Sequence, residues 1–247
     1  MPPRVCIGTS GWHYPHWREV FYPRDLPTSQ WLPFYARHFP CVEINNSFYR
    51  LPEAATFRQW REQVPPGFRF AVKAPQGITH RKKLKDCGDL LARFLDHAAA
   101  LEDGLGAVLF QLPPRWRCNP RRLADFLALL PADLPCSFEF RDPSWHNEEV
   151  YGLLRSYGAA FCIFELGGLK SPLTVTADFA YVRLHGPAGP YAGSYGPARL
   201  RHWAERLQGW RRQGRDCWLF FDNDQAGYAV KNARLLRKLL GDELSDA

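Results

Sequence analysis

The sequence predicts an α/β protein built as a single (β/α)8 TIM-type barrel, and three observations favour this fold. Short apolar segments alternate with amphipathic segments along nearly the whole chain, which is the order of a parallel sheet covered by helices. Eight strand-like segments occur within 247 residues, which matches the size of this barrel. No linker, repeat or low-complexity stretch divides the chain, so we expect one domain over residues 1–247, with 241–247 as a frayed tail.

The first four strand and helix units are marked by apolar runs and by turn or capping residues. The apolar runs predict strands over residues 5–9, 41–45, 68–73 and 105–111. Thr28 is a candidate N-cap for a helix over 28–38, and a second helix is expected over 56–64. The turn Pro65-Pro66-Gly67 precedes the third strand. A helix over 86–101 is predicted by apolar residues at helical spacing, namely Leu90, Leu91, Phe94, Leu95, Ala98 and Leu101.

The second half repeats the pattern with one weak unit. Strands are expected over 136–141, 159–164, 179–185 and 217–222, and helices over 120–130, 147–157, 198–213 and 225–240. Residues 166–177 are few and carry Gly and Pro, so the sixth helix is expected to be short or degenerate. A doubly wound open sheet is the alternative fold. The segment Gly8-Thr9-Ser10-Gly11-Trp12, after the first strand, does not fit the glycine fingerprint typical of that fold.

Composition and charge exclude several classes of protein. Hydrophobic residues at 46% and charged residues at 23% are near the globular average, which excludes bulk disorder. No apolar run reaches the length of a membrane helix and no signal peptide precedes the first strand, so we expect a cytoplasmic protein without membrane contact. The seven cysteines are odd in number and lack CxxC spacing, which indicates buried thiols and no zinc site. The expected assembly is a monomer or a small homo-oligomer.

Polar residues alternate with apolar ones inside several strands, and this alternation separates a lumen face from a helix-covered face. In the second strand, Val42 and Ile44 face one way while Glu43 and Asn45 face the other. The same pattern in the other strands directs a polar set into the barrel: Glu43, Asn45, Lys73, Gln111, Glu139, Arg141, Arg183, His185 and Asp222. These residues lie near the carboxyl ends of their strands, where barrel enzymes have their active sites. Their convergence predicts a ligand site.

The residue types narrow the chemistry of that site. Lys73, Arg141 and Arg183 suit an anion such as a phosphate or a carboxylate. The candidate catalytic residues, which would move protons, are Glu43, Glu139, His185 and Asp222. The same four could bind a divalent metal, but the interleaved cations supply the positive charge that a metal would bring, so no metal or other cofactor is expected. Glu43 and Glu139 could also form the carboxylate pair of a glycosidase, and their separation cannot be obtained from the sequence.

The loops that follow the strands are aromatic and basic. Trp12, Tyr49 and Tyr195 are candidate substrate-binding residues in these loops, beside Asn45, Lys73, Gln111, Arg141 and Arg183 from the strand ends. Residues 79–85 after the third strand and 113–117 after the fourth are rich in Lys and Arg. Aromatic side chains near cations suit stacked bases and phosphates. Part of the formal charge of +7 therefore falls on the expected active face.

Seven short motifs resemble those of a known family. They are Ile7-Gly8-Thr9-Ser10-Gly11-Trp12, Val42-Glu43-Ile44-Asn45-Asn46-Ser47-Phe48-Tyr49, Phe70-Ala71-Val72-Lys73, Phe110-Gln111-Leu112-Pro113-Pro114, Glu139-Phe140-Arg141, Tyr181-Val182-Arg183-Leu184-His185-Gly186 and Phe221-Asp222-Asn223. Together they resemble the YecE-like family of bacterial and archaeal proteins, also labelled domain of unknown function 72. The resemblance covers nearly the whole chain and implies a TIM barrel. It implies no activity, because the family has no settled one.

Three functional hypotheses follow from the sequence. The first is an enzyme that acts on a phosphate-containing substrate, a nucleotide or a nucleic acid, with phosphodiester hydrolysis as one such reaction. The second is a protein that binds nucleic acid or an anionic metabolite without chemistry. The third is a carbohydrate-active hydrolase that uses Glu43 and Glu139. The expected partner is thus a phosphate-containing small molecule or a nucleic acid.

Overall fold

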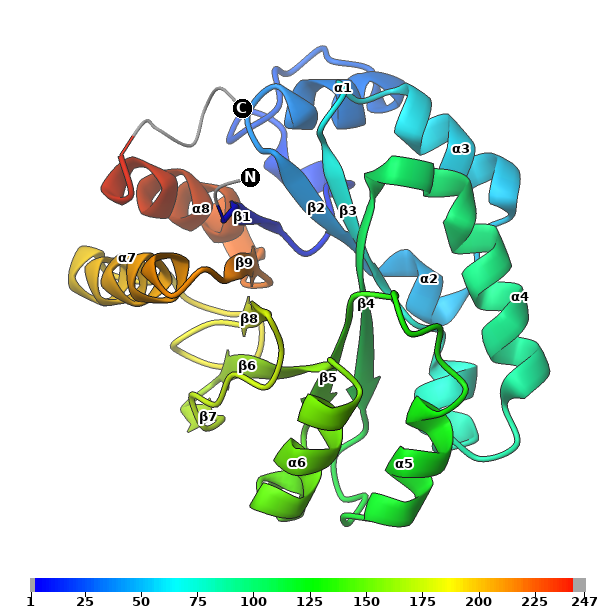
Figure 1. The fold of residues 1–247 in the computed structure, drawn as a ribbon. Helices are drawn as coiled ribbons and strands as arrows, with labels where there is room; N and C mark the ends of the chain where they lie inside the picture. Colours follow the sequence, from blue (N-terminus) through cyan, green and yellow to red (C-terminus); the bar gives the residue numbers. More distant parts are fainter. Residues whose placement is uncertain (1–2, 242–247) are drawn as a thin grey trace.

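Eight parallel strands form a nearly closed barrel in the computed structural model, which describes residues 3–241 (Figure 1). The strands follow the order β1, β9, β8, β6, β5, β4, β3, β2 around the barrel, so the first strand pairs with the last one. Their bounds are β1 Val5–Thr9, β2 Cys41–Ile44, β3 Arg69–Lys73, β4 Leu105–Leu112, β5 Cys136–Phe140, β6 Ala160–Leu166, β8 Phe179–Leu184 and β9 Asp216–Phe221. The barrel predicted from the sequence is confirmed.

The barrel consists of two four-stranded halves that meet at two short seams. Between β1 and β2 the pairing is one bridge, from Ser10 to Glu43, with Gly11 N–H donating to the Glu43 carbonyl at 2.8 Å. Gly8 permits this approach, because a Cβ there would lie 2.2 Å from the Cys41 carbonyl oxygen. Between β5 and β6 only two residue pairs are in register, which begin with Ser137 opposite Ala160. One half therefore contains β1, β9, β8 and β6, and the other contains β2 to β5.

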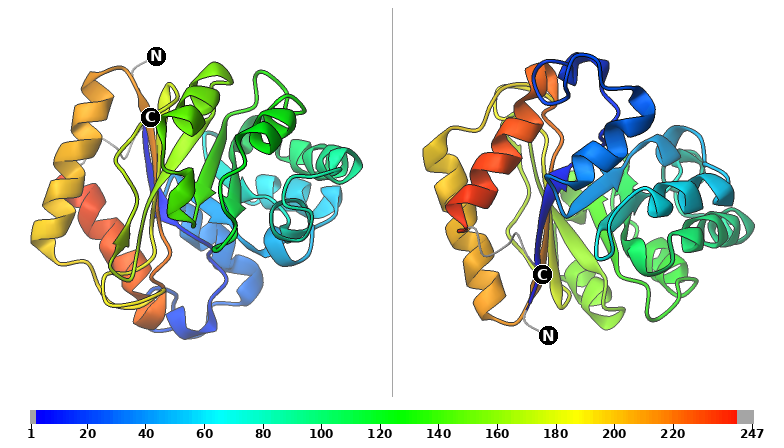
Figure 2. Two further views of the ribbon diagram at one scale, coloured as in Figure 1. Left: turned by 90° about the horizontal axis from the view of Figure 1, so that it is seen from below. Right: turned by 90° about the horizontal axis from the view of Figure 1, so that it is seen from above.

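Helices surround the strands, as Figures 1 and 2 show. Their bounds are α1 Trp31–Ala36, α2 Asn46–Tyr49, α3 Ala54–Glu62, α4 Gly88–Ala98, α5 Pro120–Leu127, α6 Glu148–Ser156, α7 Pro197–Arg212 and α8 Tyr228–Leu239. Helices α7 and α8 pack side by side along one flank (Figure 2). Thr28 does not cap α1, because it begins a separate 3-10 turn, Thr28–Gln30, whose side chains make no capping bond. Within the described part of the chain, no helix has the length and apolar character needed to cross a membrane.

The sixth unit lacks a covering helix, as the sequence predicted. After β6 the chain turns at Gly167 and Gly168 and returns as β7, Leu169–Lys170, a two-residue strand antiparallel to β6. Residues 171–178 then lead to β8 without a helix. Ser171 and Thr176 fix this segment, since their hydroxyls accept from Phe164 N–H at 2.9 Å and from Phe161 N–H at 2.7 Å. Figure 1 shows the gap in the ring of helices between α6 and α7.

Two apolar layers hold the barrel. The outer layer lies between strands and helices and contains the apolar set of the strand alternation, such as Val42, Phe138 and Val182. The inner layer fills the lower lumen with mainly small residues and three aromatic rings, Tyr181, Trp218 and Phe220. Above this inner layer the lumen is ionic, so the charged residues form a separate stratum near the carboxyl ends of the strands. The described part of the 241–247 tail is Gly241 alone, and the expectation of fraying otherwise falls outside the described residues.

Candidate functional site

Arg183 lies at the centre of the upper lumen and is fully buried. Its guanidinium donates to Glu43 at 2.7 and 3.0 Å, to Glu139 at 2.8 Å and to Asp222 at 3.0 Å. Burial alone would lower the pKa of Arg183, but Glu43, then Glu139 and Asp222, raise it well above its ordinary value. Arg183 is therefore permanently charged and occupied by three carboxylates. We call Arg183, Glu43, Glu139, Asp222, His185 and Arg141 the Arg183 network.

Glu43 is held on every side by donors. Ser10 Oγ donates to its Oε1 at 2.7 Å, and Tyr181 Oη donates to its Oε2 at 2.7 Å, in addition to Arg183. Glu43 is 0% exposed. Burial is the largest cause that raises the pKa of Tyr181 well above its usual value, followed by the Glu43 charge, so the phenol stays a donor. All of these contacts fix a carboxylate, and none leaves it open to a ligand.

Glu139 bridges the two arginines of the network. It accepts from Arg141 Nε and from Arg183 Nη1, the latter at 2.8 Å. Burial by itself would raise the pKa of Glu139, but Arg141, then Arg183 and His185, lower it well below the usual range. Arg141 stands at the top of β5, its side chain is 9% exposed, and its guanidinium lies over the Phe164 ring at 5.2 Å. Arg141 thus lies near the upper end of the network.

His185 and Asp222 form a buried dyad beside these arginines. His185 Nδ1 lies 2.9 Å from Asp222 Oδ2, and the other ring nitrogen, Nε2, lies 3.1 Å from Arg141 Nη2 and 3.3 Å from Arg183 Nη1. Because guanidinium groups only donate, we assign Nε2 as an acceptor and Nδ1 as the donor to Asp222. Burial would raise the pKa of Asp222, but Arg183 and His185 lower it. The tautomer that results is the one a general base needs.

Lys73 is the cation of the mouth, the opening at the carboxyl ends of the strands. Its Nζ lies 4.1 Å from the centre of the Phe48 ring, and within the described chain it makes no ion pair within 4 Å. Burial, then the nearby Arg183 charge, lowers its pKa from 10.5 to about 8. Ser47 Oγ donates to the Lys73 carbonyl at 2.7 Å and so ties the end of β3 to the start of α2. A lysine with this pKa exchanges its proton near neutral pH.

Two further mouth groups lie in the loops that the sequence predicted around the mouth, but neither was among the candidate site residues. His80 packs edge-on against Phe48 at 4.9 Å, and burial, then Lys73 and Arg141, lower its pKa to about 4, so it is a neutral imidazole. Tyr191, exposed and at φ 62°, lies above His185 with ring centres 5.7 Å apart. Strand alternation does not extend into loops, so it singled out neither residue. Ser10, which directly follows β1, could have been found from its place in the first motif.

The remaining predicted residues lie at different depths. Gln111 is buried and donates to the Leu112 carbonyl at 3.0 Å, while the Asn45 Oδ1 atom is buried without a hydrogen-bond partner. Tyr49 is 76% exposed on the outer side of α2. Trp12 lies away from the network, edge-on to Trp60 at 5.2 Å, where both line a separate cavity of about 230 Å³. Tyr195 is buried, and its hydroxyl accepts from Gly186 N–H at 3.0 Å, so it supports the loop after β8.

The four side chains that the sequence offers as possible metal ligands, three carboxylates and one imidazole, all contact Arg183 in the structure. Glu43, Glu139 and Asp222 each accept from Arg183, and His185 faces the same guanidinium. Among the residues that the structure describes, no group of three or more His, Cys, Asp and Glu is arranged to hold a metal ion. The site is therefore an ion-pair network with a cationic, partly exposed mouth.

A family model matches nearly the whole chain. Residues 6–247 match the family described as "Protein of unknown function DUF72". The chain belongs to this family. The resemblance found in the seven motifs is thereby confirmed, and each of the motifs that line the lumen lies inside the matched range.

Curated relatives of this DUF72 chain carry the same kind of description. It is 27% identical to the UPF0759 protein YunF of Bacillus subtilis over 274 residues, which cover 98% of this chain and 96% of that protein. It is 36% identical to the UPF0759 protein YecE of Escherichia coli over 144 residues, 57% of this chain and 50% of that protein. The match to YunF thus extends over the full barrel.

Crystal structures of other DUF72 proteins share the fold. A DUF72 protein of Thermotoga maritima is 31% identical, with a TM-score of 0.85 over 96% of this chain and 99% of that one. A DUF72 protein of Enterococcus faecalis is 20% identical, with a TM-score of 0.84 over 96% and 95% of the two chains, and shows the fold alone. The function must therefore be argued from the site.

Proposed function

We propose that this protein is an enzyme that acts on a phosphate-containing substrate at the mouth of the barrel. One observation carries the proposal: within the described chain Lys73 makes no ion pair, and it lies above a stratum whose other charges are paired. Because Arg183 is occupied by three carboxylates, it positions the network rather than the substrate. Lys73 is left to meet an incoming anion, and Arg141, whose Nε is held by Glu139, can turn its other N–H donors toward the oxygens of that anion.

The mouth also offers a neutral acceptor for the rest of the substrate. Asn45 lies directly after β2, and its buried Oδ1 atom has no partner within the described chain. A buried acceptor without a donor is costly, so a hydroxyl or amino group of a ligand would stabilise this position. The half-buried ring of Phe48 and the exposed ring of Tyr49 on α2 give apolar surface beside it. A sugar or a base attached to the phosphate meets these requirements.

His185 supplies the proton transfer in this proposal. When Arg141 turns toward the bound phosphate, Nε2 of His185 keeps only its longer contact with Arg183 Nη1, at 3.3 Å, and exchanges that contact for the proton of an attacking water. The water oxygen forms the new bond to phosphorus, the bond to the leaving oxygen breaks, and Lys73 gives that oxygen its proton. Asp222 accepts from Nδ1 and stabilises the imidazolium that forms, which is the usual task of a carboxylate behind a histidine base.

The surface around the mouth favours a nucleotide or a nucleic acid as the substrate. The loops after β3 and β4 present exposed cations, namely Arg81, Lys82, Lys83, Lys85, Arg115 and Arg117. They lie on the same end of the barrel as Lys73, because they follow the carboxyl ends of two neighbouring strands. Clustered positive charge attracts polyanions and raises their rate of association. Part of the formal charge of +7 thus lies where the proposed substrate enters.

A second candidate is a binding protein without chemistry. His185 is 0% exposed and lies beneath Arg141 and Tyr191, so its proton transfer requires Arg141 to move. The carbohydrate hydrolase is less well supported, because Glu43 and Glu139 are both buried and both bound to Arg183. A glycosidase needs one carboxyl group that protonates the leaving oxygen and one that reaches the sugar or its water.

The experiment is a turnover screen with paired variants. Phosphomonoesters, phosphodiesters, nucleotides and short single-stranded DNA and RNA are offered to the purified protein, and product is followed by chromatography and phosphate release. His185→Ala is expected to lower kcat at least about 100-fold, the scale of one general base. Lys73→Met is expected to weaken substrate binding and to lower kcat, whereas Lys238→Met, an exposed lysine on α8, serves as the matched control.

The outcomes separate the two candidates. Turnover that is lost in His185→Ala but kept in Lys238→Met supports the enzyme. Binding of oligonucleotides that weakens steeply with salt and with Lys73→Met, with no turnover of any substrate, supports the binding protein. If the phosphate compounds neither bind nor react, or if Lys73→Met and Lys238→Met behave alike, the proposal is wrong.

A further inference from the structure

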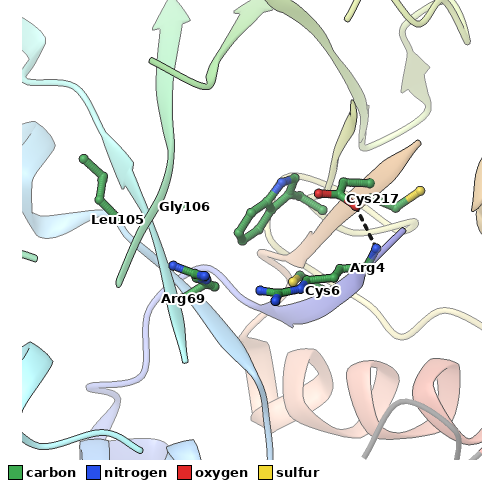
Figure 3. A pocket seen from close by; sticks show the side chains of 8 residues that line it. Arg4, Cys6, Arg69, Leu105, Gly106 and Cys217 are labelled. Atoms are coloured by element: carbon green, nitrogen blue, oxygen red, sulfur yellow. Dashed lines mark hydrogen bonds between the residues drawn. The ribbon is translucent and has the colours of Figure 1, made fainter. Parts of the chain in front are cut away.

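The end of the barrel opposite the mouth contains a cavity of about 440 Å³. It is lined by the first residues of four strands, namely Arg4, Cys6, Arg69, Leu105, Gly106, Asp216, Cys217 and Trp218. Strands β1 and β9 are neighbours on one side of the lumen, and β3 and β4 are neighbours on the other. The cavity therefore spans the lower opening of the barrel, and we call it the lower cavity (Figure 3). Its size is within the range of small-molecule sites.

Two arginines give the lower cavity its charge. Figure 3 shows the side chains of Arg4, directly before β1, and Arg69, on β3, extending into the same space. At Cys6, a hydrogen bond from Cys41 lowers the thiol pKa most; burial and the Asp216 charge act against it, and the charges of Arg4 and Arg69 lower it further. Within the described chain Arg69 makes no ion pair. Asp216 Oδ1 accepts from Arg4 N–H at 2.7 Å. Two arginines and one carboxylate thus line the same space.

An aromatic wall closes the lower cavity toward the inner layer. Trp218 is almost completely buried, and its ring reaches across the lumen to β4, where a Cβ on Gly106 would lie 2.3 Å from it. The absence of a side chain at Gly106 allows this contact. The same ring stacks against Phe220 at 6.2 Å in the inner layer. The wall is therefore closely packed and presents an aromatic ring to the cavity.

We propose that the lower cavity is a second binding site, for a small molecule that carries a carboxylate or a phosphate group. The oxyanion binds between the guanidinium groups of Arg4 and Arg69, and the apolar part of the molecule lies against Trp218. The site is separate from the mouth, since the ionic stratum and the inner layer lie between the two ends.

Cys6 provides a local reporter, because it lines the lower cavity and is 7% exposed. Its alkylation is followed by mass spectrometry with iodoacetate, an anion, and with iodoacetamide, its neutral counterpart. Cys118, which is half-buried outside the barrel, is the internal reference. We expect the rate of alkylation by iodoacetate, divided by the rate with iodoacetamide, to be higher at Cys6 than at Cys118. Arg69→Ala is expected to lower this preference about three- to tenfold. Arg93→Ala, an exposed arginine on α4, is the matched control.

Protection of the same thiol measures binding. Inorganic phosphate and benzoate are expected to slow the alkylation of Cys6 by iodoacetamide in the wild type and in Arg93→Ala. Arg69→Ala should lose both effects, while Arg69→Lys, which keeps the charge without the fork, should keep part of the phosphate effect. Trp218→Leu should lose the protection by benzoate more than that by phosphate. Should Cys6 fail to react in the folded protein, calorimetry with the same two anions measures the binding directly.

The outcomes are distinct from those for the proposed function. Phosphate binding that is lost in Arg69→Ala and kept in Lys73→Met belongs to the lower cavity, and the reverse pattern belongs to the mouth. If neither anion binds in calorimetry, or if binding and the protection of Cys6 are equal in Arg69→Ala and the wild type, the second site does not exist.

Discussion

Arg183 connects the two halves of the barrel through a single side chain. It extends from β8 in one half and donates to Glu43 on β2 and Glu139 on β5 in the other. Those two strands flank the two seams, where strand pairing is shortest. A buried ion pair stabilises a fold only when its charged groups make their hydrogen bonds. Here all three nitrogens of the Arg183 guanidinium donate to carboxylates. At the scale of one residue, Arg183 therefore compensates for the backbone bonds that the seams lack.

Replacing Arg183 should strongly lower the stability of the fold. In Arg183→Leu the carboxylate of Glu43 stays buried without a cation, which is expected to cost at least about 3–5 kcal/mol in urea denaturation. Arg155→Leu is the control, since Arg155 pairs with Glu148 at 3.2 Å on the exposed side of α6 and should change stability by less than about 1 kcal/mol. Equal, small losses in both variants would show that the network does not stabilise the fold.

Lys73 gives a pH-dependent signal at the residue scale. Burial and the charge of Arg183 lower its pKa from 10.5 to about 8, so the free amine forms about 2.5 pH units below the value of an ordinary lysine. Competitive acetylation, analysed by mass spectrometry from pH 6 to pH 11, should show a midpoint for Lys73 near pH 8. Inorganic phosphate at the mouth should move the midpoint upward, because an anion favours the ammonium form. A midpoint near 10.5 without phosphate would contradict the described environment.

At the scale of elements, close contacts between strands depend on missing side chains. Gly8 on β1 lies against the Cys41 carbonyl at the β1–β2 seam, and Gly106 on β4 lies against the Trp218 ring in the lumen. Backbone atoms cannot move aside as a flexible side chain can, so the contact at Gly8 is the stricter one. The helix-less sixth unit shows the opposite case, because the hairpin of β6 and β7 and the hydroxyls of Ser171 and Thr176 replace a whole helix.

Gly8→Ala should therefore open the β1–β2 seam. Its Cβ would lie 2.2 Å from the Cys41 oxygen, and we expect a loss of about 1–3 kcal/mol or more in chemical denaturation. Gly152→Ala is the matched control in the interior of α6, where nothing lies within 4 Å of the added Cβ. That variant should gain up to about 1 kcal/mol, because alanine favours the helix. Changes of the same sign would contradict the tight contact at Gly8.

For the whole molecule, the ionic stratum links stability to acid. The pKa values of Glu139 and Asp222 are lowered in the folded state, mainly by arginine against the effect of burial. Their contribution to stability is complete above the unfolded carboxyl pKa of about 4 and is lost as the pH falls through the folded values. Melting temperatures measured from pH 7 to pH 3 should fall steeply below about pH 4. Glu139→Gln should flatten this slope, and an unchanged slope would contradict the assignment.

Much of this architecture could be predicted from the sequence, and the limits follow from what strand alternation encodes. Alternation assigned Glu43, Glu139 and Arg183 to the lumen, because a strand has only two faces. It could not tell that Arg183 is fully paired while Lys73 is not, since that depends on distances across the barrel. The loops carry no such alternation, so the sequence could not show that Trp12 packs edge-on against Trp60 or that the Tyr195 hydroxyl accepts from Gly186 N–H.

The pairing of β1 with β9 has a consequence for synthesis on the ribosome. Val5 and its register partner, Cys217, are separated by 212 positions in the sequence. Strands β2 to β5 can pair with one another as they emerge, but β1, buried along its whole length in the finished barrel, has no ladder partner until β9 appears. Until β9 has been made, the apolar β1 therefore lacks the strand that covers its edge, and we expect this long-range pairing to be a slow step in closing the barrel.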